Sequence, residues 1–195
     1  MKLRRLKPAV SWSEILSGHC SSVPSRARVS GRECIKSLSS LKNELYRLKS
    51  RGKKVVFTNG CFDILHYGHV KYLQDARAKG DCLVVAVNSD ASIRRIKGKN
   101  RPVVGENDRL KVVSSLGCVD FAVLFNEDNP LKVIKALKPD VLIKGADWSK
   151  DRIIGADFVK SYGGKVLTVK LVKGRSTTAL IEKIVRDFGC SLNHG

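Results

Sequence analysis

Two histidines, His66 and His69, lie three residues apart with Gly68 between them. The apolar run at residues 55–57 predicts a buried strand before them, and residues 70–79 have the pattern of a helix after them. A helix start carries unpaired backbone N–H groups and the positive end of a dipole, which suits a phosphate. Side chains three residues apart can face the same way, and both imidazoles can donate hydrogen bonds to phosphate oxygens. We interpret this pair as a candidate phosphate site; a helix-capping pair without chemistry is the alternative.

The string His66-Tyr67-Gly68-His69 resembles the HxGH signature of the nucleotidyltransferase superfamily. The longer segment Thr58–Leu73 is most similar to the adenylyltransferase domain of bacterial ADP-heptose synthases, which join ATP to heptose 1-phosphate and release pyrophosphate. The resemblance extends from about Leu41 to about Ile184 and includes three separated motifs. It implies that His66 and His69 are catalytic. It also implies nucleotide contacts from Thr58, Asn59, Gly60, Cys61, Phe62, Asp63 and Gly68.

A basic, turn-forming loop follows at residues 97–102. In the family the matching loop lies over the triphosphate, which implies a catalytic role for Lys97 and a nucleotide contact for Lys99; a solvated loop is the alternative. Arg109, in the next expected helix, matches an arginine that the superfamily uses near the phosphates or to support the site. We include Arg109 among the nucleotide-binding candidates.

The second motif, Lys144-Gly145-Ala146-Asp147-Trp148, follows another apolar strand. It resembles the family's Lys-Gly-Gly-Asp-Trp, with Ala146 in place of the second glycine, and alanine would be strained if that position needs a positive φ. Lys144 is placed to contact a phosphate as a point charge, and we count it as catalytic. Gly145, Asp147 and Trp148 are nucleotide-binding candidates, and a polar turn with a surface tryptophan is the alternative.

The third motif, Ser176-Thr177-Thr178, precedes an apolar helical pattern and has the residue types of a helix N-cap and first turn. In the superfamily such a start reaches the nucleotide phosphates through hydroxyl and backbone N–H groups. We therefore predict that these three residues bind the nucleotide, with an ordinary helix start as the alternative. Arg175 either touches the substrate phosphate or faces water.

Apolar runs alternate with helical patterns along the chain, which predicts an α/β fold with a doubly wound, five-stranded parallel sheet of the Rossmann-like type. The three motifs follow the first, fourth and fifth strands, so they should converge where the strand order reverses. Expected strands are residues 55–57, 82–87, 119–125, 141–143 and 166–169. Expected helices are residues 39–49 with Ser39 or Ser40 as cap, 70–79, one from 91, 106–116, 130–137, 151–162, and one after 176–178.

The sequence of 195 residues is long enough for one domain with a sizeable core. No apolar run approaches the roughly 20 residues needed to span a bilayer. The six cysteines show neither a CxxC pair nor zinc spacing, which favours reduced cysteines in a cytoplasmic protein.

The net charge of +19 is unevenly placed, because residues 1–53 hold 13 Lys/Arg against 3 Asp/Glu. We divide the chain into a basic extension at residues 1–35, expected to be flexible, and a nucleotidyltransferase domain at residues 36–195. An organelle-targeting segment and an ordered flap or partner contact are the alternatives for the extension.

The resemblance implies transfer of AMP from ATP to heptose 1-phosphate, giving ADP-heptose for lipopolysaccharide core synthesis. Mg²⁺ would be held by the phosphates, because no all-protein carboxylate cage is evident. The expected partners are ATP, a sugar phosphate, a second copy in a homodimer, and a separate heptose kinase, with no membrane. Glycerol-3-phosphate cytidylyltransferase and FAD synthetase-like adenylyltransferase are the alternative activities. A nucleic-acid-binding protein with salt-dependent affinity is the alternative of another class.

Overall fold

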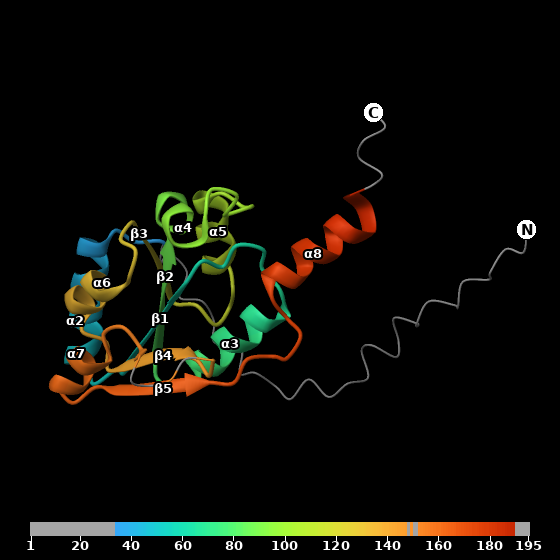
Figure 1. Cartoon of the computed structure of the whole chain (residues 1–195). Helices are drawn as coiled ribbons and strands as arrows, with labels where there is room; N and C mark the ends of the chain where they lie inside the picture. Colours follow the sequence, from blue (N-terminus) through green and yellow to red (C-terminus); the bar gives the residue numbers. More distant parts are fainter. Residues whose placement is uncertain (1–33, 148, 150–151, 190–195) are drawn as a thin grey trace, which may run out of the picture. The chain divides into compact units, whose positions relative to one another are not determined.

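The computed structural model describes residues 34–147, 149 and 152–189, and its centre is a five-stranded parallel sheet (Figure 1). The strand order is β3-β2-β1-β4-β5, and each neighbouring pair is parallel. The strands are β1 (Val55–Gly60), β2 (Cys82–Asn88), β3 (Phe121–Phe125), β4 (Val141–Gly145) and β5 (Lys165–Val169). The predicted fold class is confirmed.

The helices follow the strands in alternation, as the apolar pattern predicts. They are α2 (Leu38–Ser50), α3 (Tyr67–Arg77), α4 (Asp90–Lys97), α5 (Glu106–Ser114), α6 (Leu131–Leu137), α7 (Ala156–Ser161) and α8 (Thr177–Phe188). No helix among the described residues is long and apolar enough to cross a membrane.

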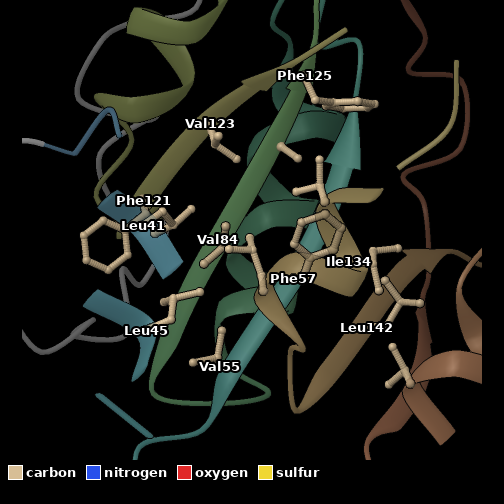
Figure 2. Close-up of a cluster of buried hydrophobic side chains, with 14 of the residues drawn as sticks. Leu41, Leu45, Val55, Phe57, Val84, Phe121, Val123, Phe125, Ile134 and Leu142 are labelled. Atoms are coloured by element: carbon tan, nitrogen blue, oxygen red, sulfur yellow. The ribbon is translucent and has the colours of Figure 1, made fainter. Parts of the chain in front are cut away.

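Two separate cores form because successive residues of a strand point to opposite faces of the sheet. Val55 and Phe57 of β1 pack with side chains of α2, α6 and α7, whereas Val56 packs with those of α3 and α5. Figure 2 shows the first core, in which Phe57 lies among Val84 of β2 and the aliphatic side chains of the other strands and helices. Burying such a side chain stabilises the fold by roughly 1.5–3 kcal/mol, so both faces hold β1 at the middle of the sheet.

Several helix starts differ from the sequence-based expectation. The cap of α2 is Ser37, whose side chain accepts a hydrogen bond from the backbone N–H of Ser40. This makes the prediction of Ser39 or Ser40 as cap wrong by one turn or less. α7 begins only at Ala156, because Gly155 takes a positive φ of 87° and interrupts the helix expected from residue 151.

The strand order reverses between β1 and β4, which lie side by side at the middle of the sheet. Crossover connections leave to opposite sides at such a point, so the loops after the two strands part and leave a crevice at their carboxyl ends. Residues 61–66 follow β1, and residues 146–147 follow β4. The three predicted motifs therefore approach one another from separate elements.

Residues 34–36 extend the sheet at its β3 edge. Lys36 N donates to Ala122 O at 3.0 Å, and Ala122 N donates to Cys34 O at 2.9 Å. Residues 1–33 lie outside the described residues, so the flexibility expected for the extension at residues 1–35 stays a prediction for all but its last two residues.

Candidate active site

A cavity of about 360 Å³ opens at the carboxyl ends of β1 and β4. The predicted site residues that line it are Asn59, Gly60, Cys61, Phe62, His66, Gly68, His69, Lys97, Lys144, Gly145, Asp147, Ser176, Thr177 and Thr178. Five lining residues were not among the predicted site residues: Tyr72, Arg101, Leu171, Val172 and Arg175. Thr58, Asp63, Lys99 and Arg109 are described but do not line it, and Trp148 lies outside the described residues.

The cavity has two walls that come from distant parts of the chain. We call residues 59–69 the β1 wall, because they continue β1 into the start of α3. We call residues 171–178 the C-terminal wall, because they lead from β5 into α8. Lys144 and Asp147, at the end of β4, lie with both walls around the cavity.

The two histidines form a stacked pair in the β1 wall. His66 is the N-cap residue of α3, with extended backbone, and His69 lies in the first turn. The ring centroids are 3.9 Å apart and the planes differ by 21°. Gly68 makes this possible, because a Cβ there would lie 2.9 Å from Cε1 of His66. The Nδ1 atoms of both rings are buried and lack a hydrogen-bond partner among the described residues.

Both histidines are held in the neutral form at pH 7. Burial, followed by the neighbouring His66 and then Lys97, lowers the pKa of His69 to about 4. Burial and then the charge of Arg175 lower the pKa of His66 below its ordinary value. Each neutral ring carries one N–H donor, so each histidine can donate one hydrogen bond to a phosphate oxygen.

Phe62 supports His69 from behind. Its φ of 46° is left-handed, which is uncommon for a bulky residue and marks a constrained loop. The phenyl ring meets the His69 imidazole edge to face, with centroids 5.4 Å apart. Gly60 leaves room for it, because a Cβ there would lie 3.1 Å from the Phe62 ring.

Lys144 extends from β4 to the floor of the cavity. Its Nζ lies 3.4 Å from the backbone oxygen of Asn59. Burial lowers the pKa of Lys144 to about 8, although the nearby Cys61 and Asp147 act in the opposite direction. The ammonium is thus largely charged at pH 7, and a bound phosphate would stabilise that charge further.

The loop after β4 is unstrained at Ala146. The described non-glycine residues with positive φ are Phe62 and Lys138, so the strain considered for Ala146 does not occur. At Gly145, a Cβ would lie 2.4 Å from Oδ1 of Asp147, so a larger residue there would require the Asp147 side chain to move. That contact shows how closely the Asp147 carboxylate folds back beside the cavity.

Thr58 and Tyr72 lie beneath the cavity floor and at its side. Thr58 is fully buried, and its hydroxyl lies 2.7 Å from the Tyr72 hydroxyl. Tyr72 also donates to the backbone oxygen of Ile143 at 3.3 Å, and burial raises the pKa of Tyr72 to about 12. These bonds tie α3 to β1 and β4, so Thr58 acts on the site through Tyr72 and the position of α3.

Arg109 is 1% exposed and forms hydrogen bonds inside the protein. Its guanidinium donates to the backbone oxygens of Val104, Cys61 and Asn88 at 2.8, 2.5 and 2.8 Å. It also pairs with the Asp90 carboxylate at 2.8 Å. Of the two roles that the superfamily gives this arginine, the geometry favours support of the site.

The C-terminal wall ends in the capped start of α8. The Ser176 hydroxyl accepts a hydrogen bond from the backbone N–H of Ala179 at 3.1 Å. The Cβ of Arg175 would lie 3.1 Å from a Cβ added at Gly68, so the two walls meet there. Arg175 lies next to the third motif, and that proximity was the available signal for its place in the site. Leu171 and Val172 had no such signal.

The arrangement suits a polyanionic ligand. Lys97, Arg101, Lys144 and Arg175 line the cavity, and among its described lining residues Asp147 is the single carboxylate. Backbone and side-chain donors at the starts of α3 and α8 add to this positive potential. The described residues contain no group of three or more His, Cys, Asp or Glu side chains arranged to hold a metal ion.

The sequence matches the cytidylyltransferase-like family model over residues 57–191. It is 53% identical over 155 residues to the bifunctional protein HldE of Geobacter metallireducens, a match that covers 80% of this chain and 32% of that protein. It is 55% identical over 150 residues to the bifunctional protein HldE of Geotalea uraniireducens, covering 77% and 31%. The chain thus spans about a third of the length of these curated relatives.

Solved structures agree with this assignment. The lipopolysaccharide core biosynthesis protein of Thermoplasma volcanium is 36% identical, with a TM-score of 0.53, covering 64% of this chain and all of that one. The pantoate-beta-alanine ligase of Francisella tularensis shares the fold at 16% identity, with a TM-score of 0.56 and coverage of 80% and 81%. The chain therefore belongs to the cytidylyltransferase-like family, within the nucleotidyltransferase superfamily that its HxGH motif indicates.

Proposed function

We propose that the protein transfers AMP from ATP to heptose 1-phosphate, giving ADP-heptose and pyrophosphate for lipopolysaccharide core synthesis. The observation that carries this proposal is the stacked pair of neutral histidines in a cavity lined by four cationic side chains. The identity to HldE proteins and the similarity to the lipopolysaccharide core biosynthesis protein of Thermoplasma volcanium support the choice of acceptor.

The reaction is an in-line displacement. An oxygen of the sugar phosphate attacks the α-phosphorus of ATP, a new P–O bond forms, and the bond to the β-phosphate oxygen breaks. Pyrophosphate leaves with the electron pair. Because the attacking phosphate is already an anion, the protein supplies positioning and charge stabilisation and no covalent intermediate.

The residues divide this work between them. His66 and His69 donate hydrogen bonds to the oxygens of the α-phosphate as negative charge shifts toward the leaving group. Lys97 and Lys144 balance the charge of the departing pyrophosphate. Thr177 and Thr178, at the start of α8, hold phosphate oxygens through hydroxyl and backbone N–H groups.

Mg²⁺ enters with ATP as part of the substrate. Mg²⁺ prefers octahedral oxygen ligands and usually keeps several waters and substrate phosphates in its shell. The cavity fits such a complex, because its cationic lining binds phosphate while Asp147 offers one carboxylate. The ion neutralises charge on the leaving pyrophosphate.

The protein works with two partners. A heptose kinase activity supplies the sugar 1-phosphate that the reaction consumes. We place the reaction in the cytoplasm, where ATP is available. The second partner is another copy of this chain.

The homodimer forms through α8. This 12-residue helix has no buried residue, and Figure 1 shows it extending beyond α3. Its apolar stripe, defined here as Leu180, Ile181, Ile184, Val185 and Phe188, is half-buried or exposed. A helix this short is marginal alone in water, and a second copy would cover the stripe.

Replacing Ile184 with Glu should therefore convert the dimer to monomer, measured by analytical ultracentrifugation. Lys183→Glu, which changes a charge on the helix outside the stripe, is the matched control and should remain dimeric. A wild-type chain that sediments as a monomer at micromolar concentration would refute the dimer.

The activity is tested by measuring pyrophosphate release in the presence of Mg²⁺. ATP, CTP and GTP are each combined with heptose 1-phosphate, glycerol 3-phosphate and FMN. We expect release with ATP and heptose 1-phosphate alone. Pyrophosphate release with another pair would show that the proposed acceptor or nucleotide is wrong but that the protein is still a nucleotidyltransferase. Retention of nucleic acid that weakens steeply with salt, without release for any pair, would favour a binding protein.

A further inference from the structure

The carboxylate of Asp63 is buried beside the cavity and holds the next loop. Asp63 is 4% exposed, and its Oδ1 accepts hydrogen bonds from the backbone N–H groups of Val103 and Val104, both at 2.9 Å. A single oxygen thus fixes two successive residues of the loop between α4 and α5. The nucleotide contact expected of Asp63 is hard to reconcile with this position.

The other carboxylate oxygen faces a cation. Arg101 Nε lies 2.9 Å from Oδ2 of Asp63, and the two side chains are 17% and 1% exposed. The atoms are close enough for an ion pair but are not aligned as a hydrogen bond. The charge of Asp63 is therefore matched by Arg101.

The loop is held from its other side by Arg109. Its Nε donates to the backbone oxygen of Val104 at 2.8 Å, and its Nη1 donates to the backbone oxygen of Cys61. Val104 is therefore bound at both its N–H and its oxygen by residues that are themselves buried. This leaves little freedom to the backbone that carries Arg101.

Arg101 is turned toward the site. It lines the cavity together with Lys97, His66 and His69. A guanidinium has five N–H donors, and Asp63 faces the one on Nε, which leaves the four on the Nη atoms. That fork is suited to two oxygens of one phosphate, which a lysine cannot bind in the same way.

We propose that Arg101 is a phosphate-binding residue of this site and that Asp63 is the residue that positions it. The proposal rests on the proposed nucleotide transfer and adds to it a residue and a division of roles. Asp63 orients the guanidinium and cancels part of its charge until ATP binds. The triphosphate then takes the Nη donors while Nε stays beside Asp63.

The test compares Arg101→Gln, Asp63→Asn and the double variant. Asparagine at position 63 keeps an oxygen for Val103 and Val104 but presents an amide N–H₂ to Arg101. ATP binding with Mg²⁺ is measured by calorimetry, pyrophosphate release gives kcat and KM, and thermal unfolding reports stability. Arg94→Gln, on the exposed side of α4, is the matched charge-removal control.

We expect Arg101→Gln to weaken ATP binding by about 10- to 100-fold, the range for a hydrogen bond to a charged group. Asp63→Asn should weaken it by about tenfold, yet by less than about twofold in the Arg101→Gln background, because the two residues act as one unit. Arg94→Gln should leave both ATP binding and KM within about twofold of wild type.

Independent effects of the two substitutions, or ATP binding unchanged in Arg101→Gln, would overturn the proposal. A lower unfolding temperature in Asp63→Asn with normal ATP affinity would reduce Asp63 to a structural role and also overturn it. If the wild type binds ATP but does not use heptose 1-phosphate, the proposed acceptor is wrong. The ATP affinities of the variants relative to wild type would still test the role of Arg101. A wild type that binds no ATP would overturn both the proposed nucleotide transfer and the proposed role of Arg101.

Discussion

The β1 wall and the C-terminal wall line the same cavity but differ in how they are held. In the β1 wall, Phe62 is 6% exposed, Asp63 is 4% exposed, and the cysteine backbone at position 61 bonds to buried Arg109. In the C-terminal wall, Arg175 and Ser176 are exposed, and α8 behind them buries no residue. Core packing therefore positions the first wall, whereas the C-terminal wall ends in a helix start that is held by its local Ser176 cap.

The two walls also differ in their proposed function: the β1 wall carries the histidine pair, and the C-terminal wall binds phosphate. The histidine pair needs a fixed geometry, because misplacement of a donor weakens its bond in the transition state. A wall that closes on the phosphates can be less stable, since ligand binding supplies the missing contacts. Each of the following substitutions should affect one wall and spare the other.

The largest expected effect comes from Arg109→Leu. The backbone oxygens of Val104, Cys61 and Asn88 and the Asp90 carboxylate would lose their donor, which typically costs about 3–5 kcal/mol. We expect the free energy of unfolding in urea to fall by that amount. Arg95→Leu removes an exposed partner of Asp128 and should cost less than about 1 kcal/mol. Equal losses would show that the β1 wall does not depend on Arg109.

Next in size is His69→Ala. Loss of one preorganised donor costs about 3–4 kcal/mol in the transition state, which corresponds to a few hundredfold in kcat. Stability should change by less than about 1 kcal/mol, because the buried Nδ1 of His69 has no partner to lose among the described residues. Steady-state kinetics and urea unfolding measure the two quantities. A folded variant with full turnover would disprove the proposed role of the pair.

Ser176→Ala should have a smaller effect, confined to the C-terminal wall. Removing an N-cap typically costs about 1 kcal/mol, equivalent to about fivefold in ATP affinity if α8 must be ordered to bind. The unfolding temperature should not change, since α8 buries nothing. Ser37→Ala removes the cap of α2, which buries Leu41 and Leu45. That control should lower stability and leave ATP affinity intact; the reverse pattern would contradict the comparison.

A further effect is on the pH dependence of stability. The pKa of His69 is about 4 in the folded protein, against 6.5 as its ordinary value. The unfolded chain therefore binds more protons between these values, so stability falls as the pH is lowered through that window. Thermal unfolding of wild type at pH 7 and pH 5 should show this fall. His69→Asn should make the fall smaller, and an identical fall in both proteins would refute the assignment.

The sequence predicted the sheet and the meeting of its motifs because both follow from apolar periodicity and from parallel topology. Strand β2 is fully buried, as its unbroken apolar run predicts. Helix starts were less predictable, because several serines near Ser37 were equally suitable as caps. The early end of the expected helix at Gly155 depends on a backbone angle that the sequence does not specify.

The direction of long basic side chains could not be predicted in the same way. Arg101 and Arg109 lie eight residues apart in the sequence, yet one lines the cavity and the other is buried under the β1 wall. The difference arises from partners distant in sequence, such as Asp63 and the backbone of Cys61. Likewise, Tyr72 was not among the predicted site residues, yet it lines the cavity and its hydroxyl lies 2.7 Å from that of Thr58.

The short pairing of residues 34–36 with β3 also protects the protein against aggregation. An uncovered strand edge offers free N–H and C=O groups to the edge of another chain and promotes aggregation. The bonds of Ala122 to Cys34 and Lys36 occupy those groups at the middle of β3. A chain shortened to begin at Ser37 would keep every residue of the cavity but should lose solubility on concentration. A minimal catalytic fragment should therefore keep residues 34–36, which cover the β3 edge of the sheet.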